Sequence, residues 1–238
     1  MIIDKEKLEK ELKDFINDEK IKIDVSLHKY IDENNQRGLS QMIGRRYGYI
    51  WENLTSILLK NDDKINLTGN IYYNEYLNFW INENSIHINK ECCKESSQKL
   101  LLKFLEETTG TSTQDLCDYS FEYDEVKYAI DTKYRFNSND SKTVREIANS
   151  AKHLKEMGYM PILLMKRKKS ESQQSPIKKF EKEGWIILDN KKAFSFLYEI
   201  TKYDLEKWIK ENLNIWDYLE DYYDDLEKLR YGKSEWEF

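Results

Sequence analysis

Three charged residues, Asp118, Asp131 and Lys133, have the types and the spacing of a divalent-cation site. They lie in two runs of alternating apolar and polar residues, on either side of an Asp124-Glu125 pair that predicts a two-residue hairpin turn. In that register Asp118 lies directly opposite Asp131, with Cβ atoms roughly 4.5–5.5 Å apart. Two carboxylates at this distance repel each other unless a cation lies between them, and hard divalent cations prefer oxygen ligands. The hairpin therefore predicts a metal site with Lys133 beside it.

The same register divides the hairpin into two faces, because side chains alternate along a strand. One face carries the metal-site residues and is expected to be the polar face. Its other members are Ser120, Glu122, Lys127 and Ala129. The opposite face is apolar and is formed by Tyr119, Phe121, Tyr123, Val126, Tyr128, Ile130 and Tyr134. The alternative interpretation is an ordinary hairpin whose charged face is simply solvated.

This arrangement, an Asp followed about a dozen residues later by Asp-x-Lys on a strand that runs into a helix, resembles the PD-(D/E)XK nuclease superfamily. The resemblance implies that Asp118 and Asp131 are the two acidic residues and that Lys133 is the catalytic lysine. Cys117 stands where the family often has proline, and Asp115 is the alternative for the first acidic position.

A second stretch, GRRYGYIWE at 44–52, resembles the helix that precedes the catalytic strands in this family. The resemblance makes Glu52 the candidate third carboxylate; the alternative is an exposed helix glutamate. Together with the main-chain carbonyl of Ile130 or Thr132, these carboxylates would hold one or two Mg²⁺ ions.

The chain after the hairpin predicts a strand–helix–strand unit. An amphipathic helix around 144–154 leads into the continuous apolar run 161–165, which is typical of a strand buried on both faces. Such a crossover makes the strand from 126 and the strand at 161–165 parallel neighbours. The polar side chains near the proposed site are candidate DNA phosphate contacts, and ordinary solvated charges are the alternative. The candidates are Arg45, Arg46, Arg135, Lys142, Arg145, Asn149 and Lys152.

The charge of the chain is unevenly distributed, although its formal net charge is −6. The stretch 126–182 holds 14 Lys and Arg against 6 Asp and Glu, a balance of +8. The stretch 204–238 holds 5 against 11, a balance of −6. Because the basic stretch begins at the proposed site, where phosphate charge must be neutralised, the acidic total does not exclude a DNA enzyme.

The cysteine and histidine residues argue against a disulfide-bonded protein and against a zinc site. Three cysteines form no disulfide framework and no Cys-x-x-Cys pair, and three scattered histidines lack the spacing of zinc ligands. No apolar run approaches the roughly 18 residues of a membrane span, and the charged N-terminus has no signal-peptide pattern. We expect a reduced protein without a membrane segment, located in the cytoplasm of a prokaryote.

The expected fold class is α/β (α+β), with a mixed central sheet, a βαβ crossover and flanking helices around a restriction-endonuclease-like core. We expect one nuclease domain over 1–238, because this length permits one sizeable core. Its parts would be a helical N-terminal addition at 1–36, the core at 37–190, an insertion at 61–96 and a helical acidic part at 191–238. The insertion is the candidate specificity region. Further expected elements are helices at 4–17, about 23–33, 97–107 and 177–183 and a strand at 185–188.

Within the superfamily the arrangement most resembles type II restriction endonucleases, and the stretch 37–190 resembles the ApaLI-like group. The resemblance implies Mg²⁺-dependent hydrolysis of double-stranded DNA at a short palindromic sequence by a homodimer, with a DNA methyltransferase encoded nearby. Two other classes remain open from the residues alone. One is a structure-specific repair or junction nuclease with the same core, and the other is a non-enzymatic DNA- or partner-binding module.

Overall fold

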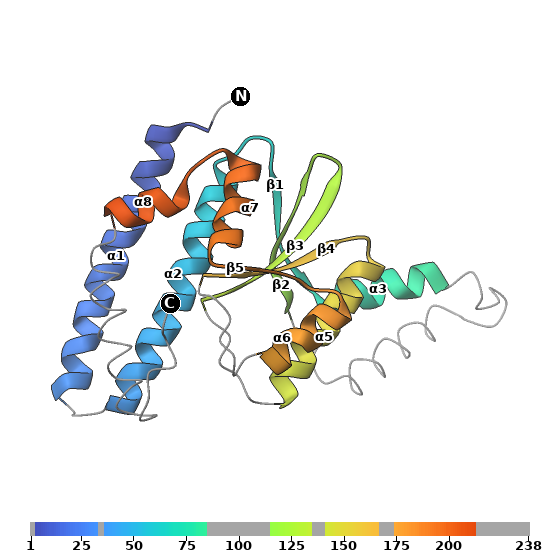
Figure 1. The fold of residues 1–238 in the computed structure, drawn as a ribbon, viewed down its shortest axis with the longest axis horizontal. Coiled ribbons are helices and arrows are strands. Elements are labelled where there is room, and N and C mark those ends of the chain that lie inside the picture. Colours follow the sequence, from blue (N-terminus) through green and yellow to red (C-terminus); the bar gives the residue numbers. More distant parts are fainter. Residues whose placement is uncertain (1–2, 33–35, 85–114, 135–140, 167–173, 213–238) are drawn as a thin grey trace.

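A five-stranded mixed sheet organises the residues that this computed structural model describes, which are 3–32, 36–84, 115–134, 141–166 and 174–212 (Figure 1). The strand order is β1-β2-β3-β4-β5, antiparallel from β1 to β3 and parallel from β3 to β5. The strands are β1 (Asn66–Tyr72), β2 (Asp115–Tyr123), β3 (Val126–Lys133), β4 (Met160–Met165) and β5 (Ile186–Asp189). The helices are α1 (Lys5–Asp32), α2 (Gln36–Lys60), α3 (Tyr73–Asn84), α5 (Ser141–Glu156), α6 (Gln174–Glu183), α7 (Lys191–Thr201) and α8 (Leu205–Asn212).

The β2–β3 hairpin has the predicted register. Tyr123 pairs with Val126 and Tyr119 pairs with Ile130. Asp124 and Glu125 both have positive φ, 52° and 64°, as a two-residue turn that follows the strand twist requires. The turn forms without glycine because the paired strands on both sides fix its ends. The prediction of the hairpin and its register is therefore confirmed.

The predicted crossover is also confirmed. β3 leads into α5 and then into β4, which pairs with β3 in parallel from Tyr128↔Met160 to Lys133↔Met165. A second unit through α6 adds β5 on the far side of β4. Five consecutive residues of β4, from Pro161 onward, are buried, because helices cover the central strand from both sides.

Two hydrophobic clusters lie on opposite faces of the sheet. The apolar face of the hairpin packs with α1, α2, α7 and α8, as its alternation predicts. The other face is covered by α3, α5 and α6. The middle of the face predicted to be polar is buried, at Ser120 and Ala129. Only its two ends stay polar, at Glu122 and Lys127 near the turn and at Asp131 and Lys133 at the carboxyl end of β3.

The N-terminal stretch forms one long helix, so the expectation of separate helices at 4–17 and about 23–33 is wrong. No glycine or proline lies between them to end the first helix. The carboxylate of Glu19 is buried between α1 and α2, where it accepts bonds from Arg46 Nη1 at 3.2 Å and Lys22 Nζ at 2.6 Å. This pair ties the first two helices together.

We expect the Glu19→Ala variant to lower the free energy of unfolding by about 2 kcal/mol, since it leaves the partly buried Arg46 without its buried partner. Chemical denaturation would measure the loss. The matched control is Glu211→Ala, which removes an exposed i,i+4 pair with Lys207 and should change stability by less than about 1 kcal/mol. Equal effects of the two variants would contradict a structural role for the buried pair.

The stretch 61–96, expected as an insertion, contributes to the sheet in its described part. Residues 66–72 form the edge strand β1, and Tyr76 of α3 donates a 2.6 Å hydrogen bond to Glu156 of α5 and stacks on His153. Sequence alternation does not reveal β1, because Gly69 adopts φ 85° and three register shifts interrupt its pairing. A base-reading role for 61–96 stays a prediction, and residues 85–96 lie outside the described residues.

The remaining predicted elements are confirmed where the structure describes them. The predicted helix at 177–183 is α6, and the predicted strand at 185–188 is β5. The helical prediction after 191 corresponds to α7 and α8, in which Trp208 and Ile209 are buried. The predicted helix 97–107 and the chain beyond 212 lie outside the described residues. No helix within the described ranges is long and apolar enough to cross a membrane.

Candidate metal centre

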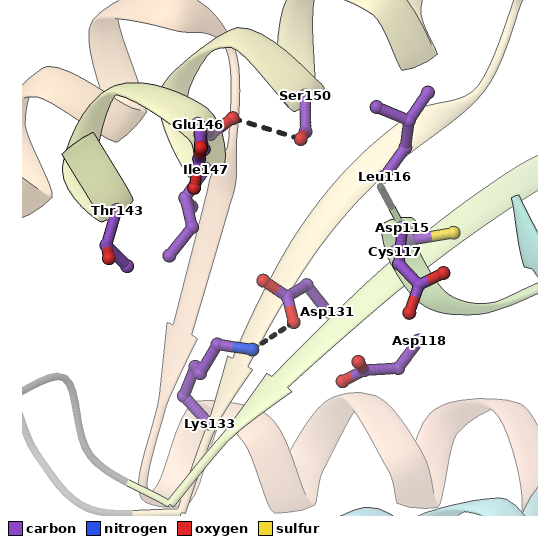
Figure 2. Close-up of a pocket in the computed structure, with 10 residues that line it drawn as sticks. All are labelled: Asp115, Leu116, Cys117, Asp118, Asp131, Lys133, Thr143, Glu146, Ile147 and Ser150. Carbon is purple, nitrogen blue, oxygen red and sulfur yellow. Dashed lines mark hydrogen bonds and ion pairs between the residues drawn. The ribbon is translucent and has the colours of Figure 1, made fainter. Parts of the chain in front are cut away.

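The carboxyl end of β3 and the amino end of β2 form one wall of an open pocket, and α5 forms the opposite wall. Figure 2 shows Asp118, Asp131 and Lys133 projecting toward the same space from the two strands. The structure thus brings together the three residues that the sequence selects, although the strand pairing ends at Tyr119↔Ile130, one step before the two aspartates. Asp115, the alternative for the first acidic position, also lines the pocket.

Thr132 fixes the position of the Asp118 carboxylate. Its main-chain nitrogen and its hydroxyl both donate to Asp118 Oδ2, each at 2.6 Å. Two donors on one oxygen hold the carboxylate in one orientation across the end of the hairpin. The sequence predicted Thr132 as a ligand through its carbonyl, and the structure adds this side-chain role.

Asp131 is buried and bonded to the ammonium group of Lys133. Burial, with a further contribution from the Asp118 carboxylate, raises the pKa of Asp131 to about 7 despite the opposing effect of Lys133. Burial alone would lower the pKa of Lys133, but the Asp131 and Asp118 carboxylates raise it above its ordinary value. At neutral pH Lys133 is therefore a cation, whereas Asp131 is close to its midpoint.

Glu52 lies on α2, which packs against the apolar face of the hairpin. Its carboxyl is half-buried, and burial and then the Asp118 carboxylate raise its pKa, while Lys133 acts in the opposite direction. Glu52 is thus electrostatically coupled to both residues, and its role as the third carboxylate stays a prediction. Glu52 does not line the pocket itself, because the pocket opens toward α5.

The donor set fits Mg²⁺. Within the described residues, no group of three or more His, Cys, Asp and Glu side chains is placed to hold a metal ion. Mg²⁺ does not require such a group, since it commonly binds through one or two carboxylates and keeps several waters or phosphate oxygens as ligands. Burial is the main cause of the raised pKa of Asp131 and the Asp118 carboxylate adds to it, so a bound divalent cation would favour the charged form of Asp131.

One flank of α5 lines the pocket, and its residues were not predicted from the sequence to belong to the site. Its lining residues are Thr143, Glu146, Ile147 and Ser150. Their spacing of three, one and three residues marks one helix face, next to the predicted apolar stripe. That periodicity was visible in the sequence, but which flank of the helix faces the site depends on how α5 docks on the sheet.

The predicted DNA-contacting residues that the structure describes lie on α5 and α2, outside the pocket lining. Four of them, Lys142, Arg145, Asn149 and Lys152, are exposed on α5 but do not line the pocket. Arg45 is exposed on α2, whereas Arg46 is engaged with Glu19. Arg135 lies outside the described residues. Contact of these residues with DNA stays a prediction, and for Arg46 a structural role is evident.

The assembled site offers two carboxylates at a hairpin end with a lysine cation beside them, and Glu52 of α2 lies outside the pocket lining. Such a set can bind a divalent cation and donate a hydrogen bond to an anionic oxygen in the same pocket. Comparisons of the chain with protein-family models, curated proteins and solved structures found no match.

Proposed function

We propose that the protein is a Mg²⁺-dependent type II restriction endonuclease that hydrolyses phosphodiester bonds of double-stranded DNA at a short palindromic sequence. The observation that carries the proposal is the convergence of Asp118 and the Asp131-x-Lys133 pair in one open pocket, at the junction of a hairpin and a βαβ crossover. The same arrangement of sequence and elements underlies the resemblance to the PD-(D/E)XK superfamily.

The acidic residues would hold the cation. Asp118 presents a carboxylate already oriented by Thr132, and Asp131 lies across the hairpin from it with Glu52 nearby. When bound, Mg²⁺ would acidify a water molecule and neutralise charge that develops on the phosphate. Deprotonation of Asp131 is required for this role, and its pKa of about 7 places that step near neutral pH.

Lys133 acts as a hydrogen-bond donor in this proposal. Its raised pKa keeps the ammonium charged at neutral pH, so it is unsuited to accept a proton from water. Its side chain is about one-third exposed at the pocket, where a phosphate oxygen or the attacking water could replace Asp131 as its partner. A preorganised cation at this position would stabilise charge in the transition state.

The substrate and assembly follow from the resemblance. Double-stranded DNA, a palindromic site and a homodimer are properties of type II enzymes, and the local excess of basic residues after 126 is compatible with DNA binding. A DNA methyltransferase gene beside this one would support a restriction role, since the host genome must be protected.

The proposal is tested by incubating the purified full chain with a long DNA of known sequence, in Mg²⁺ and in EDTA. Discrete fragments that require Mg²⁺ are expected, and mapping their ends would give the recognised sequence. A smear, or nicking confined to junctions and flaps, would instead support a structure-specific nuclease. Binding with steep salt dependence but no cleavage in Mg²⁺ or Mn²⁺ would overturn the enzymatic proposal in favour of a binding module.

A further inference from the structure

One oxygen of the Asp118 carboxylate is occupied by the chain itself. Thr132 donates to Oδ2 twice, from its main-chain nitrogen and from its hydroxyl, each at 2.6 Å. The pairing of β2 with β3 ends at Tyr119↔Ile130, so the Thr132 amide bonds a side chain where a continued ladder would supply a main-chain carbonyl. The Thr132 hydroxyl is an additional donor that no main-chain pairing requires.

These two bonds use the acceptor capacity of Asp118 Oδ2. A carboxylate has about four lone-pair sites, shared equally between its oxygens. Two donors on Oδ2 therefore leave only Oδ1 for a cation. Coordination through both oxygens needs a lone pair from each of them, so the Thr132 hydroxyl restricts Asp118 to a single ligand atom.

Asp131 is also occupied at one oxygen, because the Lys133 ammonium group donates to its Oδ1. A side-chain hydrogen bond joins Asp131 to Asp118 when one of the two carboxyl groups carries a proton, so these groups are in direct contact. Among the residues that the structure describes, no group of three or more His, Cys, Asp and Glu side chains is placed around a metal position. The chain therefore presents few free oxygens to a cation.

Magnesium and calcium ions differ in their demand for such oxygens. Ca²⁺ takes roughly 6–8 oxygen ligands in a flexible geometry and binds carboxylates through one oxygen or through both. Mg²⁺ requires a near-octahedral geometry, keeps several waters and binds through one or two carboxylates. A site whose carboxylates offer single oxygens therefore suits Mg²⁺ better than Ca²⁺.

We propose that the Thr132 hydroxyl is a positioning donor that sets the cation selectivity of the site, favouring Mg²⁺ over Ca²⁺ by restricting Asp118 to one ligand oxygen. The inference rests on the proposed Mg²⁺ site and adds a selectivity determinant to it. The hydroxyl acts through Asp118 and has no contact of its own with the cation. Without the hydroxyl, Oδ2 regains a lone pair for Ca²⁺, while Oδ1 is held less firmly for Mg²⁺.

The test is calorimetric titration of the full chain with Mg²⁺ alone and with Ca²⁺ alone, for the unchanged protein and for Thr132→Val. The variant keeps the branched side chain and the main-chain donor but has no hydroxyl. Its Mg²⁺ affinity should fall about 10-fold, the effect of losing a hydrogen bond that supports a ligand. Its Ca²⁺ affinity should rise or fall by less than about twofold, because Asp118 gains a second ligand oxygen.

Two further variants separate selectivity from a structural effect, which would weaken the binding of both ions alike. Thr132→Ser retains the hydroxyl and should restore the ratio of Mg²⁺ to Ca²⁺ affinity of the unchanged protein. Thr201→Val is the matched control, because Thr201 is also buried and its hydroxyl donates to the Leu197 carbonyl at 2.7 Å on α7, outside the pocket lining. It should leave both affinities unchanged.

The outcomes separate this inference from the proposed function. If Thr132→Val changes the two affinities by the same factor, or changes neither, the selectivity role is overturned even if the protein cleaves DNA. The same shift of the ratio in Thr132→Ser would also overturn it. A ratio that shifts as expected in a protein that cuts no DNA would support the inference and refute the nuclease. Binding of neither ion would overturn both.

Discussion

The Lys133→Ala variant is expected to lose Mg²⁺-dependent DNA cleavage by about 10²–10³-fold or more, the effect of removing one preorganised donor from a transition state. The lysine is cationic at neutral pH and reaches the pocket between the two walls. Its loss therefore removes charge stabilisation, and it also removes the bonded cation that lowers the pKa of Asp131. Single-turnover cleavage rates on a mapped site would measure the effect.

Folding and DNA binding provide the necessary controls for this variant. Lys127→Ala removes an exposed lysine from the same strand, near the hairpin turn, and should leave the cleavage rate within about twofold. DNA affinity in Ca²⁺ should be similar for both variants. Cleavage by Lys133→Ala at the rate of the unchanged protein would remove the central claim about the site.

The second large effect is expected from Asp131→Asn. The carboxylate is one of the two proposed ligands at the hairpin end, so the variant should lose both Mg²⁺-dependent cleavage and the rise in melting temperature that Mg²⁺ produces. In the unchanged protein, Mg²⁺ should raise the melting temperature more at pH 8 than at pH 6. The reason is that Mg²⁺ competes with the proton for the Asp131 carboxylate, whose pKa is about 7.

Asp131 also gives the cation-free protein a characteristic pH dependence. Its pKa of about 7 in the folded state lies above the unfolded value of about 3.9, so the folded state binds this proton more tightly. The stability from this group is complete below about pH 4 and is lost as the pH rises through 7, by on the order of 4 kcal/mol.

Unfolding free energies of the unchanged protein and Asp131→Asn, measured from pH 4 to pH 8 in EDTA, would isolate this contribution. The variant should gain stability relative to the unchanged protein as the pH rises, since asparagine does not ionise. Glu122→Gln, at an exposed position of the same hairpin, is the control and should show no such trend. A constant difference between the unchanged protein and Asp131→Asn would contradict a raised pKa.

Local patterns predicted the part of the site that lies on the hairpin. Strand alternation and a two-residue turn fix which residues pair, so the positions of Asp118, Asp131 and Lys133 followed from the chain itself. The parallel placement of β3 and β4 followed from the strand–helix–strand order in the same way. These relations involve neighbours in sequence or a single crossover, and they need no knowledge of distant contacts.

Other features were decided by packing between segments far apart in the sequence. β1 joins the sheet although a glycine and register shifts hide its alternation, because β2 offers it an open edge. Arg46 donates a hydrogen bond to Glu19, 27 residues away in the sequence, and this contact is not predicted by its position next to Arg45. Neither partner choice is encoded in a local pattern.

The sequence alone therefore determined the acidic pair and its lysine, since their separation is set by backbone geometry within one hairpin. Only the tertiary structure decided what surrounds them: the flank of α5 that carries Glu146 and lines the pocket, and the docking of α2 that leaves Glu52 outside the pocket lining. The physical reason is that the rotation of a docked helix about its own axis is set by the whole hydrophobic face it buries. Two clusters on opposite faces of the sheet fix those rotations.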